Sequence, residues 1–311
     1  MVSAIEKRFN RGLWPWVFLV TGAFVVSTNH VLGRYIGGEI PPIGLAFWRV
    51  TVGALVLLPF AWRDILEQRF VILKEWKLFF LMAILFMPMG NAMVYLGYNF
   101  STALNGGIIA TSQPATTVFL AWLILNHNIN RKQILGVIIA AFGVLIILSE
   151  GDLFALSSLT FNKGDLMLIV ATTSFSFYTI LLRKIPSSIG PMLILVVIQI
   201  IGIIVLAPFY LYEWITYMPV PTNFFSVLVI AWVGIVVAVI AVGLTNMSVL
   251  ALGPAKSSIG HYCRAIFTAG LAIVLLNEEM EIYHWLSIGL VIIGVVLMSR
   301  GQTPTRRTEI S

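Results

Sequence analysis

The strongest constraint on the fold is an internal repeat. The stretch Gly253–Arg300 has a near-copy earlier in the chain, at Leu104–Ser149. The later copy contains the run AIVLLN, a short polar loop and the run IGVVLMS, and the earlier copy contains AWLILN, a short polar loop and FGVLIILS. Self-similarity at a fixed offset indicates a duplicated architecture. It predicts two related halves, residues 1–150 and residues 151–311.

The repeat continues upstream at nearly the same offset, where arginine and proline positions recur. The matched pairs are Arg34 with Arg183, Pro42 with Pro191, and Pro59 with Pro208. The duplication therefore extends over essentially the whole of both halves.

The composition of the chain indicates that both halves lie in a membrane. Hydrophobic residues make up 59% of the chain and charged residues only 10%, against about 25% charged in a typical soluble domain. A span of about 20 apolar residues crosses the hydrocarbon core of a bilayer. Ten such spans are predicted, at Leu13–Leu32, Ile43–Ala61, Leu78–Tyr98, Gly106–Leu125, Gln133–Leu148, Leu166–Leu182, Pro191–Leu211, Phe224–Leu250, Ala255–Leu276 and Tyr283–Ser299.

The lysine and arginine positions predict the orientation. With the N-terminus inside, fifteen of the 19 basic residues fall in inner segments, and only Arg34 and Lys163 in outer ones. Basic residues favour the cytoplasmic side, so both termini, including a short C-terminal tail, are predicted to be cytoplasmic. We expect a bacterial inner membrane. The basic residues sit in short loops between apolar spans, so nucleic acid is not an expected partner despite a net charge of +6.

Five spans per half is an odd number, so the second half must enter the bilayer from the opposite side. The predicted fold is therefore all-α, with ten transmembrane helices as two inverted five-helix repeats around a central cavity. Inverted repeats are typical of alternating-access carriers, whose substrate site lies near the midplane between the halves. A structural duplication without transport is the alternative interpretation.

The end of each repeat carries a resemblance to a known family. A long span, a short polar hairpin and an apolar helix with an internal glycine recur in both halves, and the hairpins read Asn126-His127 and Asn277-Glu278. In this pattern the chain resembles the EamA-type group of the drug/metabolite transporter superfamily, in which the hairpin commonly carries Gly-Glu. The resemblance implies ten helices around a cavity and transport of small metabolites, often amino acids or related compounds, and frequently outward.

Two arginines lie inside predicted spans, Arg49 in the second and Arg264 in the ninth, whereas all 13 acidic residues fall outside the spans or at their ends. A charge within the bilayer is costly and needs a reason. Arginine can hold a carboxylate or phosphate with two parallel hydrogen bonds, so both are predicted to bind an anionic group of the substrate. The alternatives are bonds to backbone carbonyls, snorkelling to an interface and, for Arg49, a pair with Glu39.

The ninth span also carries a polar stripe. Ser257, His261, Arg264 and Thr268 are spaced four, three and four residues apart, which puts them on one helical face. We predict that Ser257 and His261 contact substrate with Arg264. His261 has two open interpretations, a proton-coupling group and a hydrogen-bonded structural histidine.

The remaining candidates for the substrate site are polar or aromatic residues within apolar spans. They are Trp48, Asn91, Tyr95, Tyr98, Gln113 and Tyr178. Helix packing and interfacial anchoring are the alternatives for these side chains.

The predicted function is a secondary transporter that exports small organic metabolites, such as amino acids or organic anions. The expected partners are this substrate and the lipid bilayer, with the chain acting as a monomer and without cofactor or metal. A channel or facilitative pore would be expected to have a filter loop or charge ring, and a multidrug exporter of cations a buried carboxylate. The sequence lacks the common hydrolase and P-loop motifs, so no enzyme is predicted.

Overall fold

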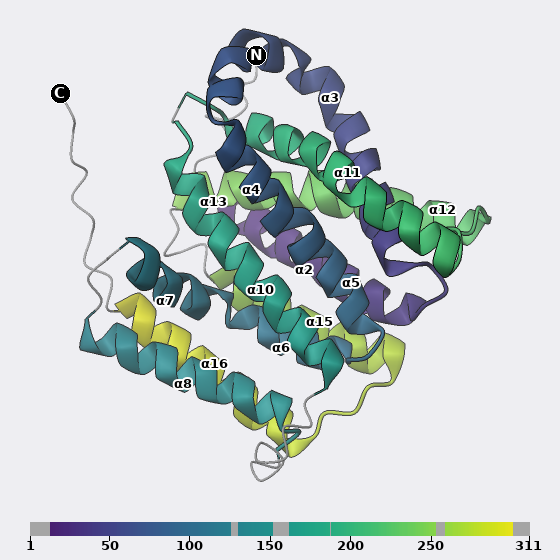
Figure 1. The fold of residues 1–311 in the computed structure, drawn as a ribbon. Helices are drawn as coiled ribbons and strands as arrows, with labels where there is room; N and C mark the ends of the chain where they lie inside the picture. The colour runs from purple at the N-terminus through teal and green to yellow at the C-terminus, as the bar shows by residue number, and fades with distance from the viewer. Residues whose placement is uncertain (1–12, 126–129, 152–161, 187, 253–258, 301–311) are drawn as a thin grey trace, which may run out of the picture.

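The computed structural model of this protein describes residues 13–125, 130–151, 162–186, 188–252 and 259–300. These residues form helices and connecting turns, without a β-strand among them. The α-helices are α2 Trp14–Ile36, α3 Pro42–Lys74, α4 Trp76–Phe86, α5 Met93–Tyr98, α6 Ala103–Thr111, α7 Gln113–Leu125, α8 Arg131–Leu148, α10 Lys163–Leu181, α11 Pro191–Thr216, α12 Phe224–Ala231, α13 Val242–Leu252, α15 Ile259–Leu276 and α16 Ile282–Arg300 (Figure 1).

The helices have the length and surface of membrane spans. In the described part of the chain, seven helical segments are long and apolar enough to cross a bilayer, and the bent pair α6–α7 makes an eighth. Two shorter apolar helices, Gly260–Leu276 and Ile282–Met298, complete the series. Large apolar side chains such as Phe60, Ile204 and Val274 are exposed on the outside of the bundle, where lipid would cover them. The predicted all-α membrane fold is confirmed.

Several helices run further than the predicted spans. Helix α3 continues to Lys74, α11 continues to Thr216, and α10 begins at Lys163. As a result Asp165 and Glu213 lie within the first and last turns of helices, and both are buried. The prediction had placed them outside the apolar spans. Apolarity marks where the hydrocarbon ends, whereas the helical hydrogen-bond ladder can continue beyond it.

Two helical segments are interrupted by proline. Pro88 lies in a π-helical segment, Met87–Ala92, that joins α4 to α5. Helices α6 and α7 are separated by Ser112, with Pro114 in the first turn of α7, and they are bent by 42°. Proline cannot donate the hydrogen bond of an α-helical turn, so the backbone must widen or bend there. A second π-helical segment, Trp232–Ala241, joins α12 to α13.

The bundle is built from close helix pairs. Helix α3 packs along α11, α2 along α15, and α8 along α16. Figure 1 shows the α8–α16 pair side by side along one edge of the molecule. Glycines allow this last approach, because a Cβ atom at Gly294 would lie 2.5 Å from the backbone oxygen of Gly136. The α3–α11 pair is central to the largest apolar cluster, together with α4.

Candidate functional site

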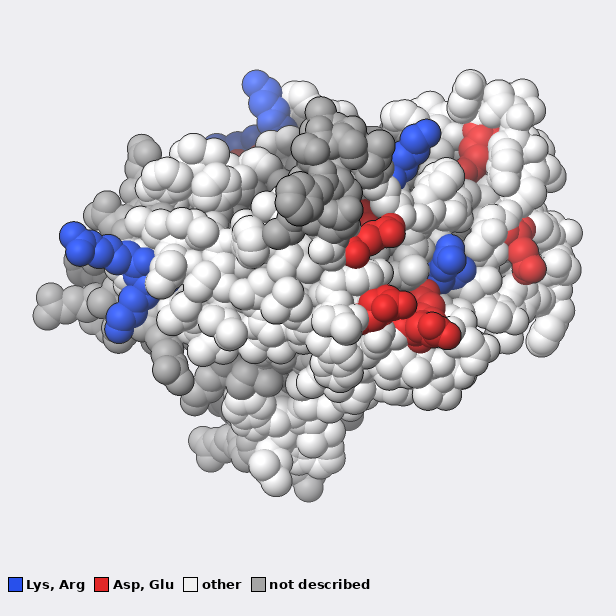
Figure 2. Space-filling model, turned by 90° about the horizontal axis from the view of Figure 1, so that it is seen from below, with Lys and Arg blue, Asp and Glu red and all other residues white. Residues whose placement is uncertain are grey.

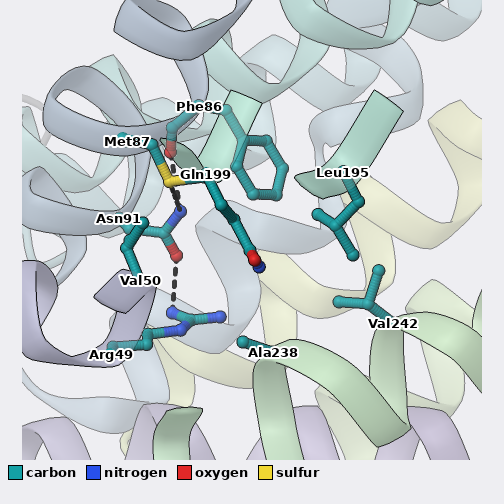
Figure 3. A pocket seen from close by; sticks show the side chains of 9 residues that line it. All are labelled: Arg49, Val50, Phe86, Met87, Asn91, Leu195, Gln199, Ala238 and Val242. Atoms are coloured by element: carbon teal, nitrogen blue, oxygen red, sulfur yellow. Dashed lines mark hydrogen bonds between the residues drawn. The ribbon is translucent and has the colours of Figure 1, made fainter. Parts of the chain in front are cut away.

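A small cavity lies between the π-helical segments and the α3–α11 pair. Its lining residues come from α3, α4, both π-helical segments, α11 and α13 (Figure 3): Arg49, Val50, Phe86, Met87, Asn91, Leu195, Gln199, Ala238 and Val242. The cavity volume is about 10 Å³, close to the space that one water molecule needs. The lining is mostly apolar, with three polar side chains directed to the same space.

Arg49 is the charged residue of this cavity. Its side chain is 8% exposed, and its Nη1 atom donates to Asn91 Oδ1 at 2.5 Å and to Tyr95 Oη at 3.3 Å. The Tyr95 hydroxyl in turn donates to Asn29 Oδ1 at 2.7 Å. Among the described residues, no carboxylate forms an ion pair with Arg49. A buried positive charge is therefore held by neutral hydrogen-bonding groups alone.

The π-helical segment explains the position of Asn91. A π-helix widens the turn and leaves carbonyl groups without their usual partners. The Asn91 side chain donates from Nδ2 to the backbone oxygen of Phe86, the residue before this segment, at 2.6 Å. This bond also turns the Asn91 oxygen toward Arg49, as Figure 3 shows.

The second predicted arginine lies close by but does not line this cavity. Arg264 Nη2 donates to His261 Nδ1 at 2.6 Å, and the backbone oxygen of Arg264 accepts from Ser27 Oγ at 2.9 Å. His30 is hydrogen-bonded to the Tyr98 hydroxyl at 2.5 Å. Helix α2 thus contacts both arginines, through Asn29 and Tyr95 to the Arg49 side chain and through Ser27 to the Arg264 backbone. We call the polar side chains around α2 and the cavity the polar region.

The structure brings several of the predicted site residues together. Arg49 and Asn91 line the cavity, and Tyr95 is bonded to Arg49. Tyr98 is fully buried, and its hydroxyl is hydrogen-bonded to His30. Tyr178 packs against the cavity residue Phe86, with ring centroids 4.5 Å apart.

Other predicted site residues lie apart from the cavity. Trp48 is 37% exposed, and its indole nitrogen donates to the Tyr210 hydroxyl at 3.2 Å. The backbone oxygen of Gln113 accepts from Ser176 Oγ at 3.2 Å. Ser257 lies outside the described residues. All of these assignments remain predictions, as does the role of Arg264.

Two residues of the polar region were not among the predicted site residues. Gln199 lines the cavity from α11, eight residues after Pro191, just as Arg49 lies seven residues after the matching Pro42. The repeat alignment was therefore a signal for Gln199. Asn29 had no comparable signal, because a single amide among apolar residues is more often a packing contact.

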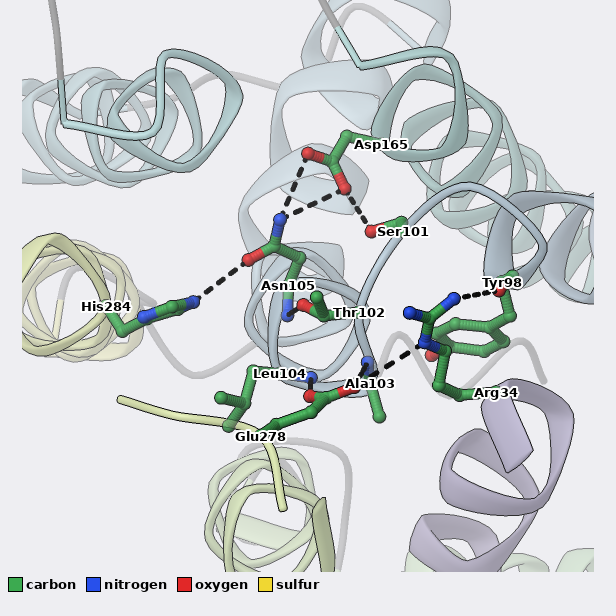
Figure 4. Close-up of polar contacts among 10 residues, drawn as sticks. All are labelled: Arg34, Tyr98, Ser101, Thr102, Ala103, Leu104, Asn105, Asp165, Glu278 and His284. Carbon is green, nitrogen blue, oxygen red and sulfur yellow. Dashed lines mark hydrogen bonds and ion pairs between the residues drawn. The ribbon is translucent and has the colours of Figure 1, made fainter. Parts of the chain in front are cut away.

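A separate polar network joins helices where α6 begins (Figure 4). Glu278 accepts hydrogen bonds from the backbone N–H groups of Ala103 at 2.8 Å and Leu104 at 2.9 Å. The N-terminus of a helix has unpaired N–H groups and a positive dipole, so a carboxylate stabilises it. Arg34 Nε lies 3.8 Å from the same carboxylate. Asn277 has a φ of +53°, a conformation that asparagine tolerates better than most residues and that glycine adopts freely.

Asn105 continues this network inward. His284 Nδ1 accepts from the backbone N–H of Glu281 at 3.0 Å, so its Nε2 carries the proton and donates to Asn105 Oδ1 at 3.1 Å. The Asn105 amide nitrogen then donates to Asp165 Oδ2 at 3.1 Å, and Ser101 Oγ also donates to Asp165. The Asp165 carboxylate, 0% exposed, is thus held by two neutral donors.

A second carboxylate caps the start of α3. Glu213, from the last turn of α11, accepts from the backbone N–H groups of Ile43 at 3.1 Å and Gly44 at 2.6 Å. We call the end of the bundle where α3 and α6 begin the capped end. Within the described ranges, every carboxylate that bridges two helices lies there. In Figure 2, Asp and Glu side chains gather on one part of the face seen from below, with Lys and Arg side chains both among them and at the opposite edge.

Comparison with known proteins identifies the family. The model of the EamA-like transporter family matches residues 13–149 and again residues 162–300. The chain belongs to the EamA-like transporter family. Members of this family are transporters, so the protein is a multi-pass membrane transporter of the drug/metabolite type and not an enzyme.

Curated relatives and a solved structure agree with this assignment. The uncharacterized transporter YyaM of Bacillus subtilis is 23% identical over 91% of this chain and 93% of its own length. An S-adenosylmethionine uptake transporter of Rickettsia prowazekii is 26% identical over 70% of this chain and 69% of its own length. A crystal structure with 14% identity and a TM-score of 0.57 covers 90% of this chain and 94% of its own, and it shares the fold.

Proposed function

We propose that this EamA-like protein is a secondary carrier that moves a small organic metabolite with an anionic group, such as an amino acid or organic anion, by alternating access. The observation that carries the proposal is Arg49. Its guanidinium group is buried beside a cavity and bonds only neutral partners among the described residues. A buried charge of this kind favours an opposite charge on a ligand.

The unused donors of Arg49 support an anion as ligand. A guanidinium group has five N–H donors, and both recorded hydrogen bonds involve Nη1. Figure 3 shows the other terminal nitrogen directed toward the region between Ala238 and the end of Gln199. A carboxylate entering this space could accept from two nitrogens at once, which is the geometry that arginine favours.

The capped end supports a mechanism in which one side of the protein closes. Glu278 and Glu213 tie α6 and α3 to elements of the other predicted repeat, and the cavity holds about one water. A metabolite therefore needs a wider state, reached when one end opens. In our proposed orientation both termini are cytoplasmic, and the capped end faces outward.

Two observations point to opposite directions of net transport. Resemblance to the superfamily favours export, which we propose, whereas the Rickettsia relatives are named for uptake of S-adenosylmethionine. S-adenosylmethionine carries an amino-acid carboxylate, so it falls within the proposed substrate class. A cation exporter is less well supported, because the buried carboxylate Asp165 is bonded to Ser101 and Asn105 and does not line the cavity.

Counterflow tests the proposed function. Proteoliposomes loaded with a mixture of unlabelled amino acids and carboxylic acids should accumulate the labelled form of a substrate, and uptake should saturate. Organic cations without an acidic group should neither be taken up nor compete. Flux that neither saturates nor exchanges would instead indicate a channel, and accumulation of cations alone would contradict the assignment.

The capped end carries a prediction of its own. Removing the Glu278 carboxylate leaves two N–H groups of α6 without their acceptor and breaks the ion pair with Arg34. Loss of such a cap lowers the stability of the closed capped end by about 1–2 kcal/mol. We expect Glu278→Ala to raise labelling of a Val50→Cys reporter, in a Cys263→Ser background, by roughly 5- to 30-fold. An impermeant thiol reagent is added from the side that labels Glu279→Cys.

The matched control is Glu279→Ala. Glu279 is exposed in the same loop, and removal of its carboxylate should leave the labelling rate unchanged. Equal rates in the Glu278→Ala and Glu279→Ala proteins would show that Glu278 does not hold the capped end closed.

A further inference from the structure

Gln199 has a buried side-chain oxygen without a hydrogen-bond partner in the described structure. The residue is 2% exposed on α11, and its Oε1 atom is fully buried with no hydrogen bond in the described structure. Buried amides in folded proteins are normally hydrogen-bonded, because leaving one unpaired costs free energy. An unpaired amide beside a cavity therefore indicates a partner that enters from the cavity.

The amide of Gln199 lies next to Arg49. Gly53 follows Arg49 by one helical turn on α3, and a Cβ atom at Gly53 would lie 3.1 Å from Gln199 Nε2. Because Gly53 has no side chain, the Gln199 side chain can lie close against α3. Figure 3 shows its amide in the space between the Arg49 and Leu195 side chains. One ligand could thus contact both polar groups.

Arg49 and Gln199 would bind different chemical groups of the same ligand. The free nitrogens of Arg49 favour an anion, and the free oxygen of Gln199 accepts from a hydrogen-bond donor. The rest of the lining is apolar, including Phe86, Leu195 and Val242. A carboxylate with an amine on the neighbouring carbon, followed by an apolar side chain, satisfies all three.

We infer that Gln199 is a specificity-determining residue that selects α-amino acids over the corresponding acids without the amine. The inference rests on the proposed function, because it assumes that Arg49 holds the carboxylate. It adds that the Gln199 oxygen accepts from the substrate ammonium. A site built to bond an N–H group discriminates strongly against analogues that lack it, because the buried polar group is then left unpaired.

The test compares two ligand pools in counterflow. One pool holds the proteinogenic L-amino acids, and the other holds the matching carboxylic acids with hydrogen in place of the α-amine, at the same concentrations. The rate of counterflow is measured for each pool with labelled members of that pool. The unaltered protein should transport the amino-acid pool at least about 10-fold better. Gln199→Met, which keeps the length of the side chain and removes the amide, should bring the ratio of the two rates close to one.

Two further variants make the result specific. Gln68 on α3 also has a buried oxygen without a partner but lies outside the cavity, so Gln68→Met should keep the ratio of the unaltered protein. Gln199→Asn keeps an amide and shortens its reach, and it should lower the ratio even if Gln199→Met fails to fold in gel filtration.

The outcomes separate this inference from the proposed function. An unaltered protein that transports both pools equally, or neither, would overturn the role of Gln199, and so would a Gln199→Met protein with an unchanged ratio. If the unaltered protein transports both pools equally and this transport still depends on Arg49, the anion-binding proposal stands although the role of Gln199 does not. Transport that is indifferent to Arg49 would remove that proposal, whatever the ratio.

Discussion

Replacing Arg49 with alanine is expected to lower the specificity constant for transport by roughly 100-fold, which corresponds to about 2.7 kcal/mol of lost binding. The guanidinium group is the charged part of the cavity lining, and hydrogen bonds to charged groups are among the strongest in proteins. Alanine would also leave the Asn91 oxygen without its partner. Initial rates in proteoliposomes, measured over a range of substrate concentrations, give the change.

Arg49→Lys should recover only part of this loss. The lysine ammonium keeps the charge, but it cannot bond Asn91 and Tyr95 while also presenting two parallel donors to a carboxylate. We expect a residual defect of roughly 10-fold, since one unmet hydrogen bond is worth about 1.4 kcal/mol. The matched control is Arg63→Ala, an exposed arginine on the same helix. Full activity of Arg49→Ala would refute anion binding at this site, and the same two changes at Arg264 test the second arginine.

The largest effect on stability is expected from Gly294→Ala. The added Cβ atom would lie 2.5 Å from the backbone oxygen of Gly136 and 2.7 Å from the backbone nitrogen of Ala140. These are main-chain atoms, so the α8 and α16 backbones would have to move apart at this point. Overpacking of this kind costs about 1–3 kcal/mol, which we expect to lower the melting temperature in detergent by roughly 2–10 °C.

The same helix provides the control. A Cβ atom at Gly289 would meet nothing within 4 Å, and alanine is a better helix former than glycine. Gly289→Ala should therefore melt at the same temperature as the unaltered protein or slightly higher. If both variants have the same melting temperature as the unaltered protein, the close approach of α8 and α16 does not limit stability.

The fold could be predicted because its signals are long and periodic. Each predicted span overlaps a helical segment of the structure, and the family model matches residues 13–149 and 162–300. The ends of the helices were less predictable. Apolarity stopped the second span at Ala61, but α3 continues to Lys74 through residues such as Asp64 that are compatible with a helix outside the hydrocarbon.

The candidate site could be predicted only in part. Arg49 was a clear signal, because a charge inside an apolar span is rare. Asn91 and Tyr95 were predicted as site residues because they are polar within an apolar span. Their bonds to Arg49 depend on helices that are distant in the sequence. The same limit applies to Asp165 and His284, which meet through Asn105 only after three helices have packed.

The small volume of the cavity has a consequence for any affinity measured on this protein. If most molecules at rest have no room for substrate, the observed dissociation constant is the intrinsic one divided by the fraction of molecules that are already open. A substitution that loosens the packing around the cavity could then tighten apparent binding without adding any contact. Comparison of ligands within one variant avoids this effect, because the open fraction is common to all of them.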